Sequence, residues 1–561
     1  MPSSAQRCSL GLDFGTESGR AVVVDLATGE ILGMAVHRYA DGVIDERLPG
    51  TNAPLGSDWA LQNPDDYLQV LRHAIPEALR QAGVKPDQVV GLGVDFTACT
   101  ILPTLADGTP LCSIPEWHGN PHAWVKLWKH HAAQPDADRI TALAAHRAEP
   151  WLARYGGKIS SEWLHSKTLQ LLRESPQVYS AAERIVEAGD WVVWQLTGRE
   201  VRNACAAGYK GLWERGIGYP SEEFLAALDP RLRNLNRTRL SAPVVPPGAF
   251  VGPLSDAGAS LTGLLPGTAV AAATIDAHAA VPGIGVTAQG AMAMILGTSS
   301  CHMLLSETEA LVPGISGVVA DGILPGFFGY ESGQAGVGDL FEWLVEQATP
   351  PRYFQQAEAQ GKNIYQILEQ EAAAQKPGEH GLIALDWWNG NRSVLTDAAL
   401  SGLIVGATLA TRAPDIYRAL IEATAFGARV IIEAHTAYGV AVRELVACGG
   451  LAERNPLLMQ IYADVTGRPI RQGGAGMASA LGAAMFGAVA AGAGSGGYST
   501  IAEAAERMVR FQSVTFHPIP EHQATYNQLY AEYLRLHDYF GRGGNEVMKR
   551  LRERRGAGNA E

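Results

Sequence analysis

The turn at residues 13–20, DFGTESGR, gathers residue types that bind phosphate. Glycine lets backbone N–H groups approach phosphate oxygens closely, and hydroxyl and guanidinium groups bind the same oxygens. A carboxylate beside them can organise Mg²⁺, which holds its water ligands tightly. The sequence therefore predicts a phosphate site with Asp13 at Mg²⁺, the phosphate-facing residues being Gly15, Thr16, Ser18 and Arg20. An ordinary hairpin turn, in which glycine only supplies a positive φ, is the alternative.

A second turn repeats this pattern about half a chain length later. In AMAMILGTSSCHMLLS, two apolar runs flank Gly297, Thr298 and Ser299. Two such turns that face each other across a cleft could hold the phosphates of one nucleotide from both sides. The repetition favours the phosphate interpretation over two unrelated hairpins and predicts two lobes of similar fold.

The segment CGGLAERNP, 448–456, has a related character. A predicted strand runs into Gly449 and Gly450, and a helix begins at Asn455-Pro456. The glycines would admit a flat ring or a phosphate, and a helix N-terminus favours anionic groups. A common strand-to-helix turn is the alternative.

Asp276 follows the apolar run AVAAATI, so a buried strand ends at an acid. A carboxylate in this place can accept the proton of an attacking hydroxyl, which is the general-base role in phosphoryl transfer. His278 is the alternative base, although a lone histidine beside alanines is more often a core residue. We therefore favour Asp276.

Other phosphate signatures are absent or misleading. The P-loop pattern GxxxxGK[ST] does not occur in the sequence. GAGSGG at 492–497 matches GxGxxG, but it follows an Ala-rich helix rather than a strand, and we interpret it as a linker.

The elements that must position these residues alternate between strand-like and helix-like segments, which is typical of an α/β fold. A helix is expected after Asn63-Pro64, a buried strand at 89–97, and helices at 180–198, 414–435 and 477–494. We expect a first lobe at 8–287, a second lobe at 288–500 and a C-terminal helical region at 501–561.

Composition excludes several classes of protein. The net charge of −13 argues against binding to nucleic acid or to an anionic membrane. The six cysteines form no CxxC pair, which favours a reducing compartment over a disulfide scaffold or a zinc site. Because MPSSAQRC lacks an apolar segment, no secretory signal is expected, and we predict a cytoplasmic protein.

These segments, taken in order, resemble the FGGY carbohydrate kinases over nearly the whole chain. The resemblance rests on LGLDFGTESGR, TIDAHAA, ILGTSS, YESGQAGVGDLFEWL and ACGGLAERNPLLMQIYADVTGRPI. It implies two ribonuclease H-like lobes, as in actin, hexokinase and Hsp70, with an ATP cleft between them. It also implies ATP and Mg²⁺ as cofactors.

The resemblance assigns further residues. It implies Asp276 as the base, Ala98, Lys210 and Glu331 as sugar contacts deep in the first lobe, and Asp13 at Mg²⁺. Phosphate contacts would be Thr16, Ser18 and Arg20, and the nucleotide site would include Gly297, Thr298, Gly338, Gly450 and Asn455. Glu17 departs from the Thr or Ser of many family members, and His278 departs from their Asn or Gln.

Within the family, VDFTACTILP, GGKISSEW and GYKGLW resemble the subgroup that phosphorylates L-ribulose at O5 in L-arabinose catabolism. A homodimer is expected by the same resemblance. Three alternatives stay open: a kinase for another pentulose or pentitol such as xylulose, an actin- or Hsp70-like ATPase switch, and a sugar-binding protein on an inactive kinase scaffold.

Overall fold

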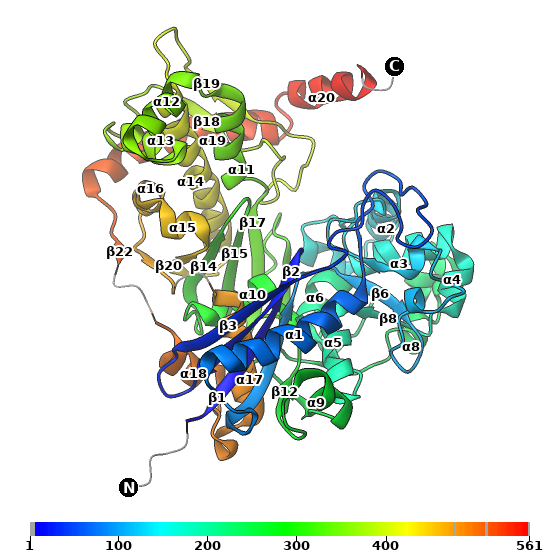
Figure 1. Ribbon diagram of the computed structural model, residues 1–561. Helices are drawn as coiled ribbons and strands as arrows, with labels where there is room; N and C mark the ends of the chain where they lie inside the picture. Colours follow the sequence, from blue (N-terminus) through cyan, green and yellow to red (C-terminus); the bar gives the residue numbers. More distant parts are fainter. Residues whose placement is uncertain (1–5, 475–476, 511–513, 559–561) are drawn as a thin grey trace.

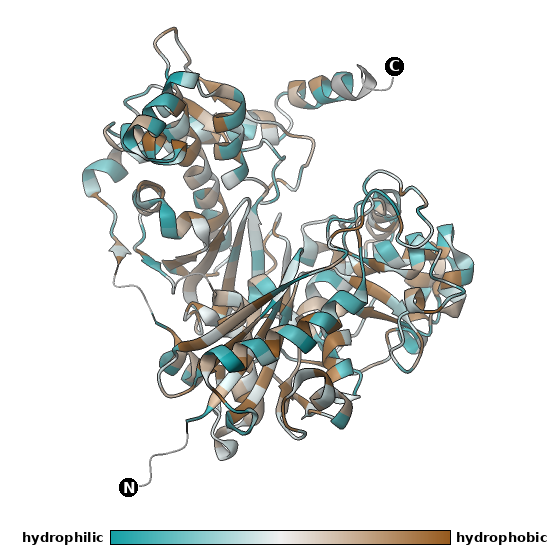
Figure 2. Ribbon diagram, viewed as in Figure 1, coloured by the Kyte–Doolittle hydropathy of each residue, from teal (hydrophilic) through white to brown (hydrophobic). Residues whose placement is uncertain are grey.

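The computed structural model describes residues 6–474, 477–510 and 514–558. Two seven-stranded sheets dominate this part of the chain and lie next to each other in the centre of the molecule (Figure 1). Hydrophobic residues concentrate along their strands, whereas the outer helices carry many hydrophilic residues (Figure 2). The α/β architecture predicted from the alternating segments is therefore present.

The first sheet carries the predicted N-terminal hairpin. β1 (Cys8–Phe14) pairs with β2 (Ser18–Asp25), and β2 pairs with the edge strand β3 (Ile31–Arg38). β5 (Val89–Phe96) runs parallel to β1 on its other side. The sheet is completed by β11 (Phe250–Pro253), β12 (Ala269–Ala271) and β13 (Thr274–Ile275). Helix α1 (Pro64–Ala82) begins where expected, because the Asn63 side chain accepts a hydrogen bond from the Asp65 backbone N–H.

The second sheet repeats this hairpin. β14 (Gly290–Leu296) pairs antiparallel with β15 (Ser300–Ser306) and parallel with β20 (Val442–Cys448). The other strands are β16 (Gly317–Ala320), β17 (Phe328–Gln334), β21 (Ile470–Gln472) and β22 (Thr515–Phe516). Both hairpins predicted from the sequence are thus confirmed.

A smaller four-stranded sheet and several helices extend the first lobe (Figure 1). The strands are β4 (Leu61–Gln62), β6 (Ile101–Thr104), β7 (Val125–Lys126) and β8 (Arg184–Glu187). The helices used below are α3 (Leu164–Glu174), α5 (Ala188–Thr197), α6 (Ala204–Gly211) and α9 (Asp256–Thr262). The continuous helix expected at 180–198 is wrong, because β8 pairs with β6 before α5 begins.

Two helices cross between the sheets. α10 (Asp276–Gly283) precedes the second sheet in sequence, yet its Val281 packs among second-sheet residues. α17 (Ala478–Ala491), predicted as a buried helix, packs against β1 and β5 of the first sheet. The helices touch through glycine: a Cβ on Gly482 would lie 1.8 Å from the carbonyl oxygen of Ala279. Only glycine at position 482 permits this contact.

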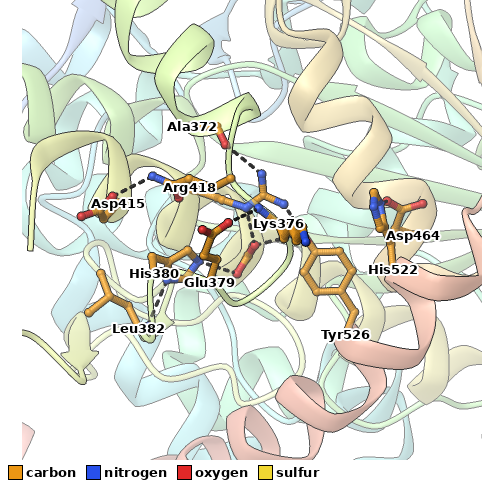
Figure 3. A network of polar contacts seen from close by, with 12 residues as sticks. Ala372, Lys376, Glu379, His380, Leu382, Asp415, Arg418, Asp464, His522 and Tyr526 are labelled. Carbon is orange, nitrogen blue, oxygen red and sulfur yellow. Dashed lines mark hydrogen bonds and ion pairs between the residues drawn. The ribbon is translucent and has the colours of Figure 1, made fainter.

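The second lobe is held by a buried polar network on α14 (Ala413–Ala437) and α19 (Pro520–Gly541) (Figure 3). The Glu422 carboxylate accepts hydrogen bonds from Arg418 Nε at 2.9 Å and from the Tyr526 hydroxyl at 2.9 Å. Its other oxygen lies 3.0 Å from His380 Nε2. Arg418 also donates to the carbonyl of Ala372. Through Tyr526, the network fastens α19 to the lobe.

The C-terminal region is not one unit. α18 (Ile501–Met508) packs in the core cluster that includes β2 and α17, whereas α19 belongs to the second lobe. α20 (Val547–Gly558) includes the basic segment KRLRERR at 549–555. Its start contacts the second lobe, where Lys549 pairs with Asp397, and the helix then projects from the body of the molecule (Figure 1). None of the helices in the described part of the chain has the length and apolar character needed to cross a membrane.

Candidate active site

The first hairpin predicted to bind phosphate is the tight connection between β1 and β2. Gly15 N–H donates to the carbonyl of Ser18 at 3.0 Å and closes the turn. Asp13 and Arg20 are paired across the two strands, with the Arg20 Nε 3.2 Å from Asp13 Oδ2. This places a guanidinium and a carboxylate side by side at the mouth of the turn.

Side chains of the first lobe support this turn from behind. The Tyr39 hydroxyl donates to the Gly15 carbonyl at 3.0 Å, and Gln62 Nε2 donates to the Thr16 carbonyl at 2.7 Å. The Trp128 indole N–H donates to Thr16 Oγ1 at 3.1 Å, which leaves the Thr16 hydroxyl proton free to reach a ligand. Sequence reasoning missed these supports, because they come from distant segments.

Three carboxylates end three neighbouring strands of the first sheet. Asp13 is paired with Asp95 between β1 and β5, and Asp95 is paired with Thr274, two residues before Asp276. Asp95 is fully buried, and neither of its oxygens has a hydrogen-bond partner among the described residues. Burial, followed by the charges of Asp13 and Asp276, raises the pKa of Asp95 well above its usual value.

Sequence analysis overlooked Asp95, although a signal was present. Gly93-Val94-Asp95-Phe96 repeats the pattern Gly11-Leu12-Asp13-Phe14, and the two segments lie in register in the sheet. The rings of Phe14 and Phe96 stack with centroids 5.0 Å apart.

The donors here fit Mg²⁺, which proteins usually hold through one or two carboxylates together with water and substrate phosphates. Asp13 lies at the strand end with 13% of its side chain exposed, and the buried Asp95 carboxyl lies beside it. No group of three His, Cys, Asp or Glu residues arranged to bind a metal directly occurs in the part of the chain that the structure describes. A site completed by water and phosphate agrees with this arrangement.

Asp276 is the first residue of α10 and remains partly accessible. Its Oδ1 accepts a hydrogen bond from the Ala277 N–H at 2.6 Å. Burial, followed by the charge of Asp13, raises the pKa of Asp276 to about 6. A carboxylate with this pKa is ionised at neutral pH and is still basic enough to take a proton.

Lys210 and Glu331 form a buried ion pair near Asp276. Lys210 Nζ, on α6, lies 2.9 Å from both carboxylate oxygens of Glu331, on β17. Their mutual attraction outweighs burial, so it raises the pKa of Lys210 and lowers that of Glu331. One of the side chains predicted for the pocket deep in the first lobe, Glu331, therefore comes from the second sheet.

His278 belongs to the same cluster but is almost fully buried. Its Nε2 lies 3.4 Å from a Glu331 oxygen, and its ring lies 4.5 Å from that of Tyr209. Burial disfavours its charge, yet Cys205 and Glu331 outweigh burial and raise the pKa of His278 to about 9. A protonated imidazole is a poor base, which favours Asp276 in that role. Ala98, the fourth predicted sugar contact, follows β5 and is partly exposed.

The second hairpin predicted to bind phosphate contacts the start of a short helix, α11 (Gly338–Trp343). Gly338 N–H donates to the Gly297 carbonyl at 3.1 Å, and Val337 N–H donates to the Thr298 carbonyl at 2.7 Å. A Cβ on Gly338 would lie 2.8 Å from the Gly297 oxygen. The structure thus brings these predicted nucleotide residues together, and Gly297 and Thr298 are exposed.

Gly449 and Gly450 join β20 to α15 (Gly450–Arg454) beside this hairpin, since Cys448 is paired with Ile295. Asn455 is more buried than these turns. It is 5% exposed, its Oδ1 accepts from the Leu458 N–H, and its Nδ2 donates to the Tyr417 hydroxyl. Asn455 therefore caps α16 (Pro456–Thr466), with little amide capacity left for a ligand.

Glu17, whose role the sequence left open, lies exposed near Gly42. It lines a cavity of about 490 Å³ together with Asp45, Asp58 and Lys129. Neither Asp13 nor Arg20 lines that cavity.

Comparison with known proteins decides the family. Residues 8–283 match the N-terminal domain, and residues 292–491 the C-terminal domain, of the FGGY family of carbohydrate kinases. The chain belongs to the FGGY family of carbohydrate kinases. The resemblance seen in the sequence is confirmed, and the molecule is a sugar kinase.

Several FGGY relatives are similar over nearly their whole length. The chain is 56% identical to a ribulokinase of Geobacillus thermodenitrificans, covering 97% of this chain and 96% of the relative. It is 54% identical to a ribulokinase of Halalkalibacterium halodurans, covering 97% of both chains, and 50% identical to one of Mycolicibacterium smegmatis, covering 100% and 98%.

Solved FGGY structures share the fold. A xylulose kinase from Rhodospirillum rubrum aligns with a TM-score of 0.75 and 22% identity, over 95% of this chain and 98% of the other. A Plasmodium falciparum glycerol kinase with ADP aligns with a TM-score of 0.72 and 15% identity, over 94% and 98%. The predicted two-lobed kinase fold is thereby confirmed.

Proposed function

We propose that this FGGY kinase transfers the γ-phosphoryl group of ATP to O5 of L-ribulose and forms L-ribulose 5-phosphate. The observation that carries the proposal is the position of Asp276 between the predicted phosphate hairpin and the polar pair. Burial, followed by the charge of Asp13 in that hairpin, raises the pKa of Asp276, and the charge of Lys210 in the pair lowers it. Relatives named ribulokinase at 50–56% identity over nearly the full length support L-ribulose as the sugar.

Sugar recognition is assigned to Lys210, Glu331 and the segment at Ala98. The ammonium donates to sugar oxygens and the carboxylate accepts from sugar hydroxyls. A sugar that fails to satisfy these buried groups leaves them unpaired, at a cost of about 1–3 kcal/mol each. This penalty supports discrimination between polyols that differ at one carbon.

Proton removal is assigned to Asp276, which takes the proton of the terminal hydroxyl as O5 attacks the γ-phosphorus. Its elevated pKa, about 6, suits this role at neutral pH. Arg20, Thr16 and Ser18 are proposed to bind phosphate oxygens from the first lobe, and Gly297, Thr298, Gly338, Gly449 and Gly450 to line the nucleotide site. Asn455 is proposed to act there mainly by capping α16.

Asp13, with Asp95 beside it, would hold Mg²⁺ through water, and the ion when bound would neutralise phosphate charge. When no ion is bound, the ion pair with Arg20 partly neutralises the charge of Asp13. Closure of the lobes would exclude water and limit ATP hydrolysis.

The test is an ADP-release assay with MgATP and L-ribulose, D-ribulose, D-xylulose, ribitol, L-arabinose or glycerol, beside a control without sugar. Highest turnover with L-ribulose supports the proposal. Highest turnover with D-xylulose keeps the mechanism and overturns the substrate. ADP release that no sugar changes overturns the sugar kinase reaction and supports a nucleotide switch.

We also propose the setting of this reaction. The reaction would serve L-arabinose catabolism in the cytoplasm, and the six free cysteines agree with a reducing compartment. A homodimer is proposed from the family resemblance, and light scattering of the purified protein tests it. The lobe boundary near residue 287 remains a prediction, to be tested by limited proteolysis.

A further inference from the structure

Lys167 is a fully buried lysine in the first lobe that the proposed mechanism does not use. It lies on α3 and is 0% exposed. Its Nζ donates to the carbonyl oxygens of Cys99 at 2.5 Å, Leu127 at 2.7 Å and Lys126 at 3.3 Å. All three of these acceptors are backbone oxygens. An ammonium group loses its hydration when it is buried, which costs free energy. Here it donates hydrogen bonds to backbone carbonyl oxygens instead.

The first group of contacts lies at the proposed sugar pocket. Cys99 follows Ala98 and has a φ of +56°, a conformation that non-glycine residues rarely adopt. The next residue is also fixed, because Thr100 N–H donates to Glu187 Oε2 at 3.1 Å. Lys167 and Glu187 thus hold this strained loop from two sides.

The second group of contacts leads to the phosphate hairpin. The Leu127 carbonyl that Lys167 holds belongs to the residue before Trp128. Trp128 in turn donates its indole N–H to Thr16 Oγ1 at 3.1 Å. One ammonium group therefore connects the loop at Ala98 with the segment that supports Thr16.

We propose that Lys167 is a positioning residue that couples the sugar pocket to the first phosphate hairpin by fixing the Cys99 and Leu127 carbonyls together. The proposal rests on the proposed function, since it takes Ala98 and Thr16 as parts of one site. Lys167 touches neither substrate and acts through the two loops. Sugar bound at Ala98 then restrains residues 125–128, and Thr16 is held ready for the phosphate.

The test compares Lys167→Met with Arg239→Met in the ADP-release assay. Arg239 is the control in the same lobe, because its Nη2 also donates to a backbone carbonyl, that of Tyr179 at 2.9 Å, which lies outside segments 97–101 and 125–128. We expect Lys167→Met to raise the KM for sugar and lower kcat, reducing kcat/KM roughly 10- to 100-fold. Arg239→Met leaves the sugar KM unchanged, and the KM for ATP stays within about twofold in both variants.

The sugar KM separates positioning from stability, because partial unfolding lowers the amount of active enzyme without changing KM. A Lys167→Met enzyme that loses total activity at an unchanged sugar KM overturns the proposal. If the wild-type protein releases no ADP with L-ribulose, the proposed function fails, and the comparison is made with the panel sugar that gives turnover.

A measurement on the wild-type protein decides the matter if Lys167→Met does not fold. Hydrogen–deuterium exchange is followed in peptides covering 97–101 and 125–128, with and without sugar. Joint protection of both segments supports the coupling. Protection of 97–101 alone overturns it.

Discussion

Lys210 and Glu331 join the two lobes through a buried ion pair, with the ammonium 2.9 Å from both carboxylate oxygens. Lys210 belongs to a first-lobe helix and Glu331 to the second sheet. In the proposed function the sugar forms hydrogen bonds with both groups, so its recognition would depend on the relative position of the lobes.

Glu331→Gln is expected to raise the KM for L-ribulose about 10- to 150-fold, since a hydrogen bond to a charged group contributes about 1.5–3 kcal/mol. The KM for ATP should change little. Asp321→Asn is the matched control, because Asp321 also forms an ion pair between the lobes, with Arg215 at 2.6 Å, but outside the predicted site. An equal rise in sugar KM in both variants would show that lobe contact, rather than sugar contact, is measured.

Asp276→Asn should lower kcat by roughly 10²–10⁴ while leaving the Kd of ATP nearly unchanged, because only proton removal is lost. Asp256→Asn provides the control, since Asp256 likewise begins a short helix of the first lobe but is exposed. Unchanged turnover in Asp276→Asn would refute the assignment of the base.

The pH profile of kcat/KM for sugar should show an acid limb. The base must be ionised, and Asp276 has a pKa of about 6, so activity falls as pH decreases through 6 and is constant from about 7 upward. The limb should disappear from the residual activity of Asp276→Asn. A limb retained in that variant assigns it to another group.

Asp95→Asn should stabilise the folded protein but lower its activity. Since the pKa of Asp95 is raised on folding, ionisation above the usual aspartate range opposes the folded state. The variant should have a higher Tm at pH 8, by about 1–4 °C, and the gain should shrink toward pH 4. Activity should fall at low Mg²⁺ and recover in part at high Mg²⁺. Asp229→Asn is the control: the hydrogen bonds from Arg231 lower the pKa of that carboxyl, so this variant should gain no stability.

Two ion pairs on α14 offer a comparison of burial at constant geometry. Arg418–Glu422 is almost fully buried, whereas Arg429–Glu433 is partly exposed, and both have i,i+4 spacing. Glu422→Gln should lower the free energy of unfolding by about 3–5 kcal/mol, because Arg418 stays buried without its partner. Glu433→Gln should cost at most about 1 kcal/mol. Sugar KM should stay constant in both variants, and urea denaturation measures the difference.

The sequence predicted those parts of the site that depend on local pattern. Gly15 and Gly297 each lie in a turn between two apolar runs, and both hairpins formed as expected. Asp276 stood out because an acid ended an apolar run. In each case the neighbours in sequence are also the neighbours in space.

The remainder depends on contacts between distant segments. The proposed role of Asp95 depends on the register of β1 and β5, and the support of Thr16 by Trp128 spans 112 residues. The strand at 184–187 was hidden in a helix-like pattern, because its pairing with β6 overrides local propensity. Buried lysines such as Lys167 look like surface residues until their surroundings are known.

The position of α17 has a consequence for how the chain is made. This helix covers β1 and β5, yet the ribosome synthesises it only after nearly all of the second lobe. Until then the apolar residues Val22, Val24 and Val90, which share a core cluster with Ala484 and Met485, have no cover. A fragment that ends near residue 287 should therefore aggregate when expressed alone, and adding 478–491 as a separate peptide should improve its solubility.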